Sequence, residues 1–122
     1  TSDIITMHVP LDRVTTHMMS DREFEKMKPT SILINTCRGP VVDENALIRA
    51  LESKEIFAAG LDVTEIEPIE SDNPLPTMPN VVVTPHLATR ALESELNAAQ
   101  FTMENAGRVV RGKGPDWIVK PV

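Results

Sequence analysis

Three side chains have the types and positions needed for acid–base chemistry on a small anion: Arg38, Glu67 and His86. Arg38 follows an apolar run and precedes a Gly-Pro turn, and His86 follows the Val81–Thr84 run. A third apolar run ends near Asp62, and Glu67 lies shortly after Asp62. Ligands bind at the carboxyl ends of strands in an open parallel sheet. An arginine there can hold a carboxylate in a two-pronged hydrogen bond, and an imidazole can act as acid and base near neutral pH.

The elements that would position these side chains alternate between short apolar runs and helical patterns. We expect strands at residues 4–9, 31–36, 57–63 and 81–84. Residues 64–80 are rich in proline and acidic residues, and we expect a loop there. Strands that alternate with helices of about ten residues predict an α/β fold with parallel strands and right-handed connections.

Three helices are expected between or after these strands. The first spans residues 20–28, where Ser20 and Glu23 have the spacing of a capping box. Asp43 is expected to cap the second helix, whose apolar positions are Ala46, Leu47, Ala50 and Leu51. The third spans residues 88–111, and its apolar stripe is expected to pack in a core. The stripe consists of Leu92, Leu96, Ala99, Met103, Ala106 and Val110.

Composition narrows the possible functions. The 122 residues allow one domain at most, and the net charge of −6 with no basic stripe argues against nucleic acid as a partner. No apolar run is long enough to cross a membrane, and no cluster of cysteine and histidine has metal-site spacing. The single cysteine, Cys37, excludes an intrachain disulfide and is compatible with a reducing cytosol. The chain starts without methionine, close to a strand, which we interpret as a piece of a longer protein.

The sequence has no G-x-G-x-x-G phosphate loop, so it could supply only half of a dinucleotide site. Its motifs nevertheless resemble those of the D-isomer-specific 2-hydroxyacid dehydrogenases, the family of phosphoglycerate, glyoxylate and hydroxypyruvate reductases. The matching blocks are HVPL at residues 8–11, NTCRGPVVDENAL at 35–47, AAGLDV at 58–63, EP at 67–68, NPLP at 73–76 and NVVVTPHLA at 80–88. One departure is Cys37, which stands where alanine is commoner.

The resemblance implies a fold and an activity. Residues 1–111 would be the second half of a Rossmann-type doubly wound parallel sheet, without its glycine-rich half, and residues 112–122 a tail leading back to a missing substrate domain. The last helix would run between the two domains, with some of its apolar surface facing the missing one. The parent protein would interconvert a 2-keto acid and a D-2-hydroxy acid by hydride transfer with NAD or NADP. This fragment alone is expected to be inactive. The parent is expected to be a cytoplasmic homodimer that binds neither membrane nor nucleic acid.

The resemblance also implies site residues. Arg38 would bind the carboxylate and carbonyl of the substrate, His86 would exchange a proton with the carbonyl oxygen, and Glu67 would hydrogen-bond His86. Asp62 would accept a hydrogen bond from the carboxamide of the cofactor. The remaining cofactor contacts would come from Val9, Pro10, Thr36, Cys37, Arg38, His86, Leu87 and Ala88.

Other interpretations stay open. A dinucleotide-dependent binding or corepressor protein of the same family would retain Arg38, Glu67 and His86. A formate dehydrogenase would have glutamine in place of Glu67, so Glu67 argues against that third interpretation. Glu67 lies in an acidic loop that could simply be solvated. Arg38 could pair with an acid, and Asp62 could cap a loop. Cys37 is expected at the edge of the core, His8 at a strand end and His17 on a wet surface.

Overall fold

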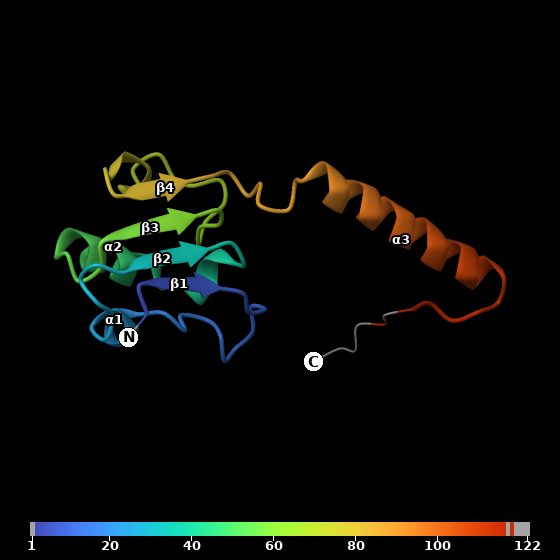
Figure 1. Cartoon of the computed structure of the whole chain (residues 1–122), viewed down its shortest axis with the longest axis horizontal. Helices are drawn as coiled ribbons and strands as arrows, with labels where there is room; N and C mark the ends of the chain where they lie inside the picture. Colours follow the sequence, from blue (N-terminus) through green and yellow to red (C-terminus); the bar gives the residue numbers. More distant parts are fainter. Residues whose placement is uncertain (1, 117, 119–122) are drawn as a thin grey trace. The chain divides into compact units, whose positions relative to one another are not determined.

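The computed structural model describes residues 2–116 and 118. Contacts divide the chain into two units, residues 1–87 and 88–122, and each is described by itself. The first unit contains a parallel sheet whose strands are adjacent in sequence order (Figure 1). Its strands are β1 (Ile4–Met7), β2 (Ile32–Asn35), β3 (Ala58–Leu61) and β4 (Val81–Val83). All four expected strands are confirmed, each shorter than its apolar run.

The helices of the first unit partly match the expectation. The helix after Asp43 is confirmed as α2 (Glu44–Glu52), and the Asp43 carboxylate accepts from the Ala46 N–H at 3.0 Å. The expected helix at residues 20–28 is only α1 (Asp21–Phe24). The capping box was wrong, because the Ser20 hydroxyl donates to Asp43 Oδ2 at 3.0 Å and makes no cap bond to its own helix. Two 3-10 helices, η1 (Gly39–Val41) and η2 (Leu75–Thr77), were not expected.

The core lies on one face of the sheet. Leu33 and Ala59 face that side in register and are buried with Leu47 and Leu51 of α2. Figure 1 shows α2 behind the strands. Strands in sequence order with right-handed connections place all their helices on the same face of a sheet, so this one-sided core follows from the topology.

The opposite face of the sheet remains open within the first unit. Ile4 pairs in register with Ile32. Two residues along the same strand, Ile34 pairs with Gly60, which in turn pairs with Val82. Because every second side chain of a strand points to the same face, these four apolar side chains share one face. Ile4 is 58% exposed and Val82 is 66% exposed. An all-parallel sheet is normally covered on both faces. In the first unit only one face of the sheet is covered.

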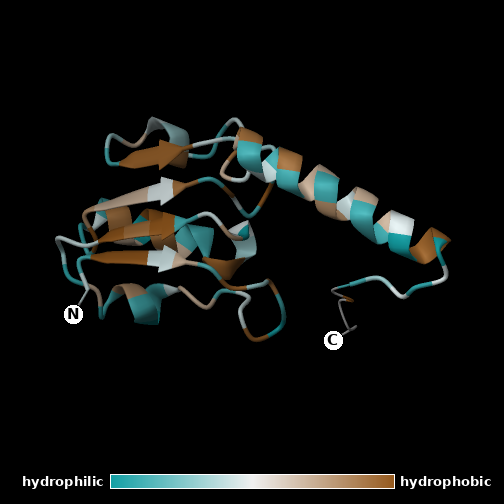
Figure 2. Cartoon of the chain, turned by 45° about the vertical axis from the view of Figure 1, so that its right-hand side comes forward, coloured by the Kyte–Doolittle hydropathy of each residue, from teal (hydrophilic) through white to brown (hydrophobic). Residues whose placement is uncertain are grey.

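The second unit consists mainly of α3 (Leu92–Val110). It begins four residues later than expected, and Figure 2 shows apolar and polar residues alternating along it. The expectation that its stripe packs in a core is not met among the described residues, because α3 has no buried residue. That part of the stripe faces a missing domain stays a prediction. Gly112, with φ +70°, ends the helix, and the Lys113 N–H donates back to the Arg108 carbonyl at 2.9 Å.

Candidate active site

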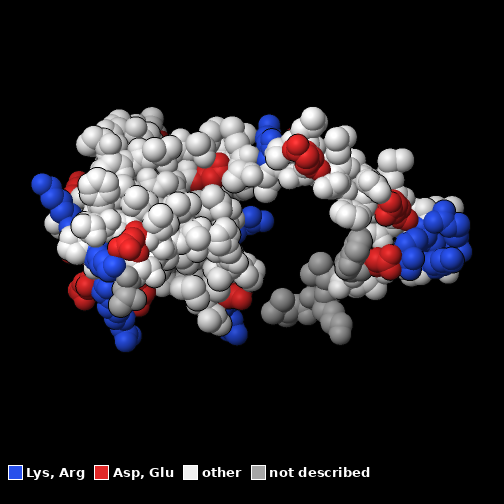
Figure 3. Space-filling model, viewed as in Figure 1, with Lys and Arg blue, Asp and Glu red and all other residues white. Residues whose placement is uncertain are grey.

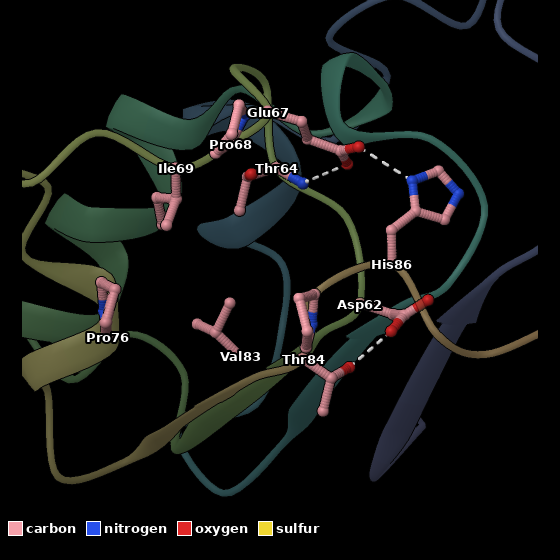
Figure 4. A pocket seen from close by; sticks show the side chains of 10 residues that line it. Asp62, Thr64, Glu67, Pro68, Ile69, Pro76, Val83, Thr84 and His86 are labelled. Atoms are coloured by element: carbon pink, nitrogen blue, oxygen red, sulfur yellow. Dashed lines mark hydrogen bonds and ion pairs between the residues drawn. The ribbon is translucent and has the colours of Figure 1, made fainter.

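An imidazole and a carboxylate meet beyond the carboxyl ends of β3 and β4. His86 Nδ1 lies 2.8 Å from Glu67 Oε2 (Figure 4). The hydrogen bond with His86 lowers the pKa of Glu67, the Thr64 N–H lowers it further through a bond of 3.2 Å to Oε1, and partial burial opposes both. An ionised carboxylate only accepts hydrogen bonds, so Nδ1 of His86 bears the hydrogen in this pair. The other ring nitrogen, Nε2, is then the atom that can exchange a proton with a ligand.

The backbone around His86 is held in an uncommon conformation. His86 has φ +55°, in the left-handed region that residues with side chains rarely adopt. Its N–H donates to the carbonyls of Asp62, at 2.9 Å, and Thr84, at 3.0 Å. These bonds hold the turn from which the ring reaches Glu67.

Asp62 is the main anchor of this turn. It is 5% exposed, and its Oδ1 accepts from the Leu87 N–H at 2.8 Å and from the Thr84 hydroxyl at 2.5 Å. The structure therefore realises the loop-capping interpretation of Asp62. Contact with a cofactor carboxamide stays a prediction for this residue.

Arg38 follows the end of β2 in a turn shaped by Asn35. Asn35 is 1% exposed; its side-chain amide donates to the Arg38 carbonyl at 3.0 Å, and its Oδ1 accepts from the Cys37 N–H at 3.1 Å. The guanidinium of Arg38 is exposed, and its Nη1 donates to the Cys37 carbonyl at 2.6 Å. Within residues 2–116 and 118, Arg38 forms no ion pair, so the interpretation that it pairs with an acid finds no support.

The expected site residues, apart from Leu87 and Ala88, line two hollows at the carboxyl edge of the sheet. A pocket of about 620 Å³ is bordered by Glu67 and His86 and has apolar walls that include Ile69 and Val83 (Figure 4). A second hollow, of about 540 Å³, is bordered by His8, Val9, Pro10, Leu11, Thr36, Cys37 and Arg38. The structure thus brings together Glu67 with His86, and separately Arg38 with four of the expected cofactor contacts.

The turn that follows β2 and the loop that follows β3 touch through one close backbone contact. Gly39, the residue after Arg38, packs so closely on Thr64 that a Cβ on Gly39 would lie 1.8 Å from the Thr64 carbonyl oxygen. Thr64 itself borders the pocket of Glu67 and His86. The turn with Arg38 and the loop with Glu67 are therefore in direct contact.

The locations of the cysteine and of the two other histidines largely agree with the sequence-based expectations. Cys37 is half-buried and packs against the core, which confirms its place at the core edge. His8 is exposed and hydrogen-bonds Thr6 Oγ1 at 2.9 Å. His17 is exposed as expected, but its Nε2 lies 3.0 Å from Glu65 Oε1. Ala88 begins the second unit, and its cofactor contact stays a prediction.

Residues without a role in the sequence interpretation also shape the site. Asn35, Thr64, Glu44 and Glu65 all make hydrogen bonds that hold the Arg38 turn or the Glu67 loop. Asn35 had a recognisable signal, because an asparagine at a strand end before a Gly-Pro turn favours side-chain bonds to the nearby backbone. Glu44 and Glu65 had none, because they are 21 positions apart.

Charge and hydropathy add two observations. In the view of Figure 3, acidic and basic side chains of residues 1–87 are interspersed, and basic side chains gather at the C-terminal end of α3. Among the described residues, none of the helices is both long and apolar enough to cross a bilayer. In the same part of the chain, no group of three or more histidine, cysteine or acidic side chains could hold a metal ion.

The fold and the site define a class of protein: a parallel α/β domain with an imidazole–carboxylate pair and an arginine at the carboxyl edge of its sheet. Residues 1–88 match the model of the D-isomer specific 2-hydroxyacid dehydrogenase NAD-binding domain. The chain belongs to this family, and its sheet is part of a Rossmann-type NAD-binding domain.

Relatives in sequence and structure agree with this assignment. The chain is 47% identical over 120 residues to glyoxylate/hydroxypyruvate reductase B of Cronobacter sakazakii, covering 98% of this chain and 37% of that protein. It is similar to the NAD+ complex of D-lactate dehydrogenase from Lactobacillus jensenii, with 35% identity and a TM-score of 0.88 over 98% of this chain and 40% of that one. It is also similar to a D-isomer specific 2-hydroxyacid dehydrogenase from Xanthobacter autotrophicus with NADPH and MES, with 41% identity and a TM-score of 0.87 over 98% of this chain and 49% of that one. The chain thus spans little more than a third of the curated relatives it matches.

Proposed function

We propose that the natural protein containing this sequence is an NAD(P)-dependent oxidoreductase that interconverts a small 2-keto acid and a D-2-hydroxy acid. The hydrogen-bonded pair of His86 and Glu67, 2.8 Å apart at the carboxyl edge of the sheet, is the observation that supports this most directly. Relatives named glyoxylate/hydroxypyruvate reductase and D-lactate dehydrogenase support a short 2-keto acid as the proposed substrate class. We also propose a homodimer in the cytoplasm.

His86 is the proposed proton donor and acceptor. In reduction, the proton leaves Nε2 for the carbonyl oxygen of the substrate while the carbonyl carbon receives a hydride, which bound NAD(P)H supplies. Glu67 accepts a hydrogen bond from Nδ1, which keeps the ring oriented and stabilises the imidazolium present before proton transfer. In oxidation of the hydroxy acid, the neutral ring takes the hydroxyl proton at the same nitrogen.

Arg38 is the proposed substrate anchor. Its guanidinium is exposed beside a hollow of about 540 Å³, and a planar fork of N–H donors matches a carboxylate. The same hollow is bordered by Val9, Pro10, Thr36 and Cys37, whose small or apolar side chains suit the nicotinamide part of a cofactor. Asp62, His86, Leu87 and Ala88 are the other proposed cofactor contacts.

The test is turnover of the natural protein with glyoxylate and hydroxypyruvate, using NADH and NADPH in turn. Asparagine tolerates a left-handed backbone, so His86→Asn should keep the turn while kcat falls by about 10²–10⁴-fold. Cofactor affinity, measured by fluorescence titration, should fall far less than kcat, because His86 is only one of the proposed cofactor contacts. If the unmodified protein binds NAD(P)H but reduces no short 2-keto acid, the dinucleotide-dependent binding protein becomes the better assignment.

A further inference from the structure

The loop with Glu67 is fastened to the first turn of α2 by two glutamates that exchange hydrogen bonds. The Glu44 N–H donates to Glu65 Oε1 at 2.8 Å, and the Glu65 N–H donates to Glu44 Oε2 at 3.0 Å. The Asn73 side-chain amide donates to Glu44 Oε1, which holds the same loop at a second point. We call Glu44, Glu65 and Asn73 the carboxylate clasp.

The clasp connects the two parts of the proposed site. Glu65 lies two residues before Glu67, whose carboxylate contacts His86. Glu44 begins α2, which follows η1 and the Arg38 turn after only two intervening residues. The Gly39–Thr64 backbone contact lies between these segments, so the clasp and this contact hold them together at two places.

The Glu67 loop depends on such fastening because it has little regular structure. Between β3 and β4 only the short η2 is helical, and Glu67 itself is exposed. The Glu65 side chain, in contrast, is only 28% exposed, and its carboxylate also lies 3.0 Å from His17 Nε2. Charge-assisted bonds of this kind are stronger than neutral ones.

We propose that Glu65 and Glu44 are positioning residues that fix the separation between Arg38 and the Glu67–His86 pair. This inference rests on the proposed function, in which Arg38 holds the substrate carboxylate while His86 reaches its carbonyl oxygen. A substrate held at one end presents its carbonyl correctly only if that separation is constant. A misplacement of about 1 Å can cost about 10²-fold in rate.

The experiment compares variants of Glu65 in the natural protein by steady-state kinetics. Glu65→Ala removes the acceptor of the Glu44 N–H, and kcat should fall by at least about 10-fold. KM for the 2-keto acid should stay within about threefold, because Arg38 still binds the carboxylate. Glu65→Gln keeps an oxygen acceptor and should retain kcat within about threefold.

A matched control separates the clasp from a general charge effect. Glu70 is an exposed acid of the same loop, so Glu70→Ala removes the same charge and should leave kcat unchanged. Glu65→Asp is a second variant that keeps the charge but shortens the side chain, and its kcat should fall as in Glu65→Ala. Full kcat in Glu65→Ala or Glu65→Asp, or equal losses in Glu65→Ala and Glu65→Gln, would overturn the proposal.

A second measurement keeps this test independent of turnover. Amide hydrogen exchange should become faster in residues 38–42 and in residues 64–67 of Glu65→Ala, but not of Glu70→Ala. If the unmodified protein reduces no keto acid while this exchange pattern is found, the proposed function fails and the clasp remains. Unchanged exchange in either segment would overturn the clasp itself.

Discussion

At the residue scale, His86 combines a rare backbone conformation with a well-fixed side chain. A left-handed φ in a residue other than glycine costs roughly 1–3 kcal/mol and persists only where the surroundings impose it. Here Asp62 and Thr84 accept the His86 N–H, and Asp62 Oδ1 accepts from the Leu87 N–H. The ring thus meets Glu67 because a buried carboxylate shapes the turn beneath it.

The Glu67 carboxylate should be important for turnover rather than for substrate binding. In Glu67→Gln the amide cannot stabilise an imidazolium by charge, so kcat at neutral pH should fall by at least about 10-fold. KM for the keto acid should change little, because the substrate carboxylate binds elsewhere. Steady-state kinetics measure both constants, and Glu70→Gln, in the same exposed acidic stretch, is the control. Equal kcat values in the two variants would exclude the proposed role.

The site residues were predictable from sequence to different degrees. Arg38 and His86 lie just after strand ends, where chemistry is expected, and Glu67 lies in the loop after β3. The motif blocks around them are specific to the family when taken together. The contact between Glu67 and His86 is confirmed, but the contact between Gly39 and Thr64 could not be foreseen. It depends on how two loops approach each other in three dimensions, and no local pattern indicates that.

At the element scale, α2 depends on its N-cap, Asp43. The Ala46 N–H lowers the pKa of Asp43 most, with smaller contributions from the Ser20 hydroxyl, His17 and Arg49, against partial burial. Asp43→Ala should therefore reduce the free energy of unfolding of the natural protein by about 0.5–2 kcal/mol at pH 7. Urea denaturation provides the measurement.

The same cap predicts a dependence on pH. Because the folded-state pKa of Asp43 lies below the unfolded value of about 3.9, the stabilisation is complete above that pH and is lost as pH falls through the folded pKa. The stability difference between the unmodified protein and Asp43→Ala should shrink below about pH 4. A difference that is constant down to pH 3 would contradict this origin.

The η1 turn should tolerate no side chain at Gly39. An alanine Cβ there would lie 1.8 Å from the Thr64 oxygen and 2.1 Å from its carbonyl carbon, both backbone atoms. Gly39→Ala should lower the free energy of unfolding by about 1–3 kcal/mol or more, through forced displacement of one segment. Chemical denaturation of the natural protein can measure this.

Gly60→Ala is the matched control, because its Cβ would meet only Ile34 Cγ1 at 3.9 Å, an ordinary contact. Its effect should stay within about 0.5 kcal/mol. If both glycines tolerate alanine equally, the close packing of the Arg38 turn on Thr64 is not maintained in solution.

Element types were easier to predict than their lengths. The apolar runs identified all four strands, but each run exceeds its hydrogen-bonded part by one to three residues. Phe57, for example, is 62% exposed and lies just before β3. The capping box failed at Ser20 because Asp43, far along the chain, accepts the serine hydroxyl, and local spacing contains no information about such a competitor.

At the scale of the whole molecule, the 122-residue chain should bind NAD weakly or not at all. The hollow near Arg38 offers contacts for one end of a dinucleotide, and the sequence contains no glycine-rich phosphate loop for the pyrophosphate. Isothermal titration calorimetry of the isolated chain, with the natural protein as control, measures the difference. Micromolar affinity of the isolated chain would show that the described residues are sufficient.

The one-sided wrapping of the sheet has a consequence for the order of folding. Contacts between segments close in sequence form faster than those between distant ones, and β1, β2 and β3 are joined through α1 and α2 over short stretches of chain. The layer with Leu33 and Leu47 should therefore condense early. Any layer that covers Ile4 and Val82 would then arrive late, on a surface whose shape is already set.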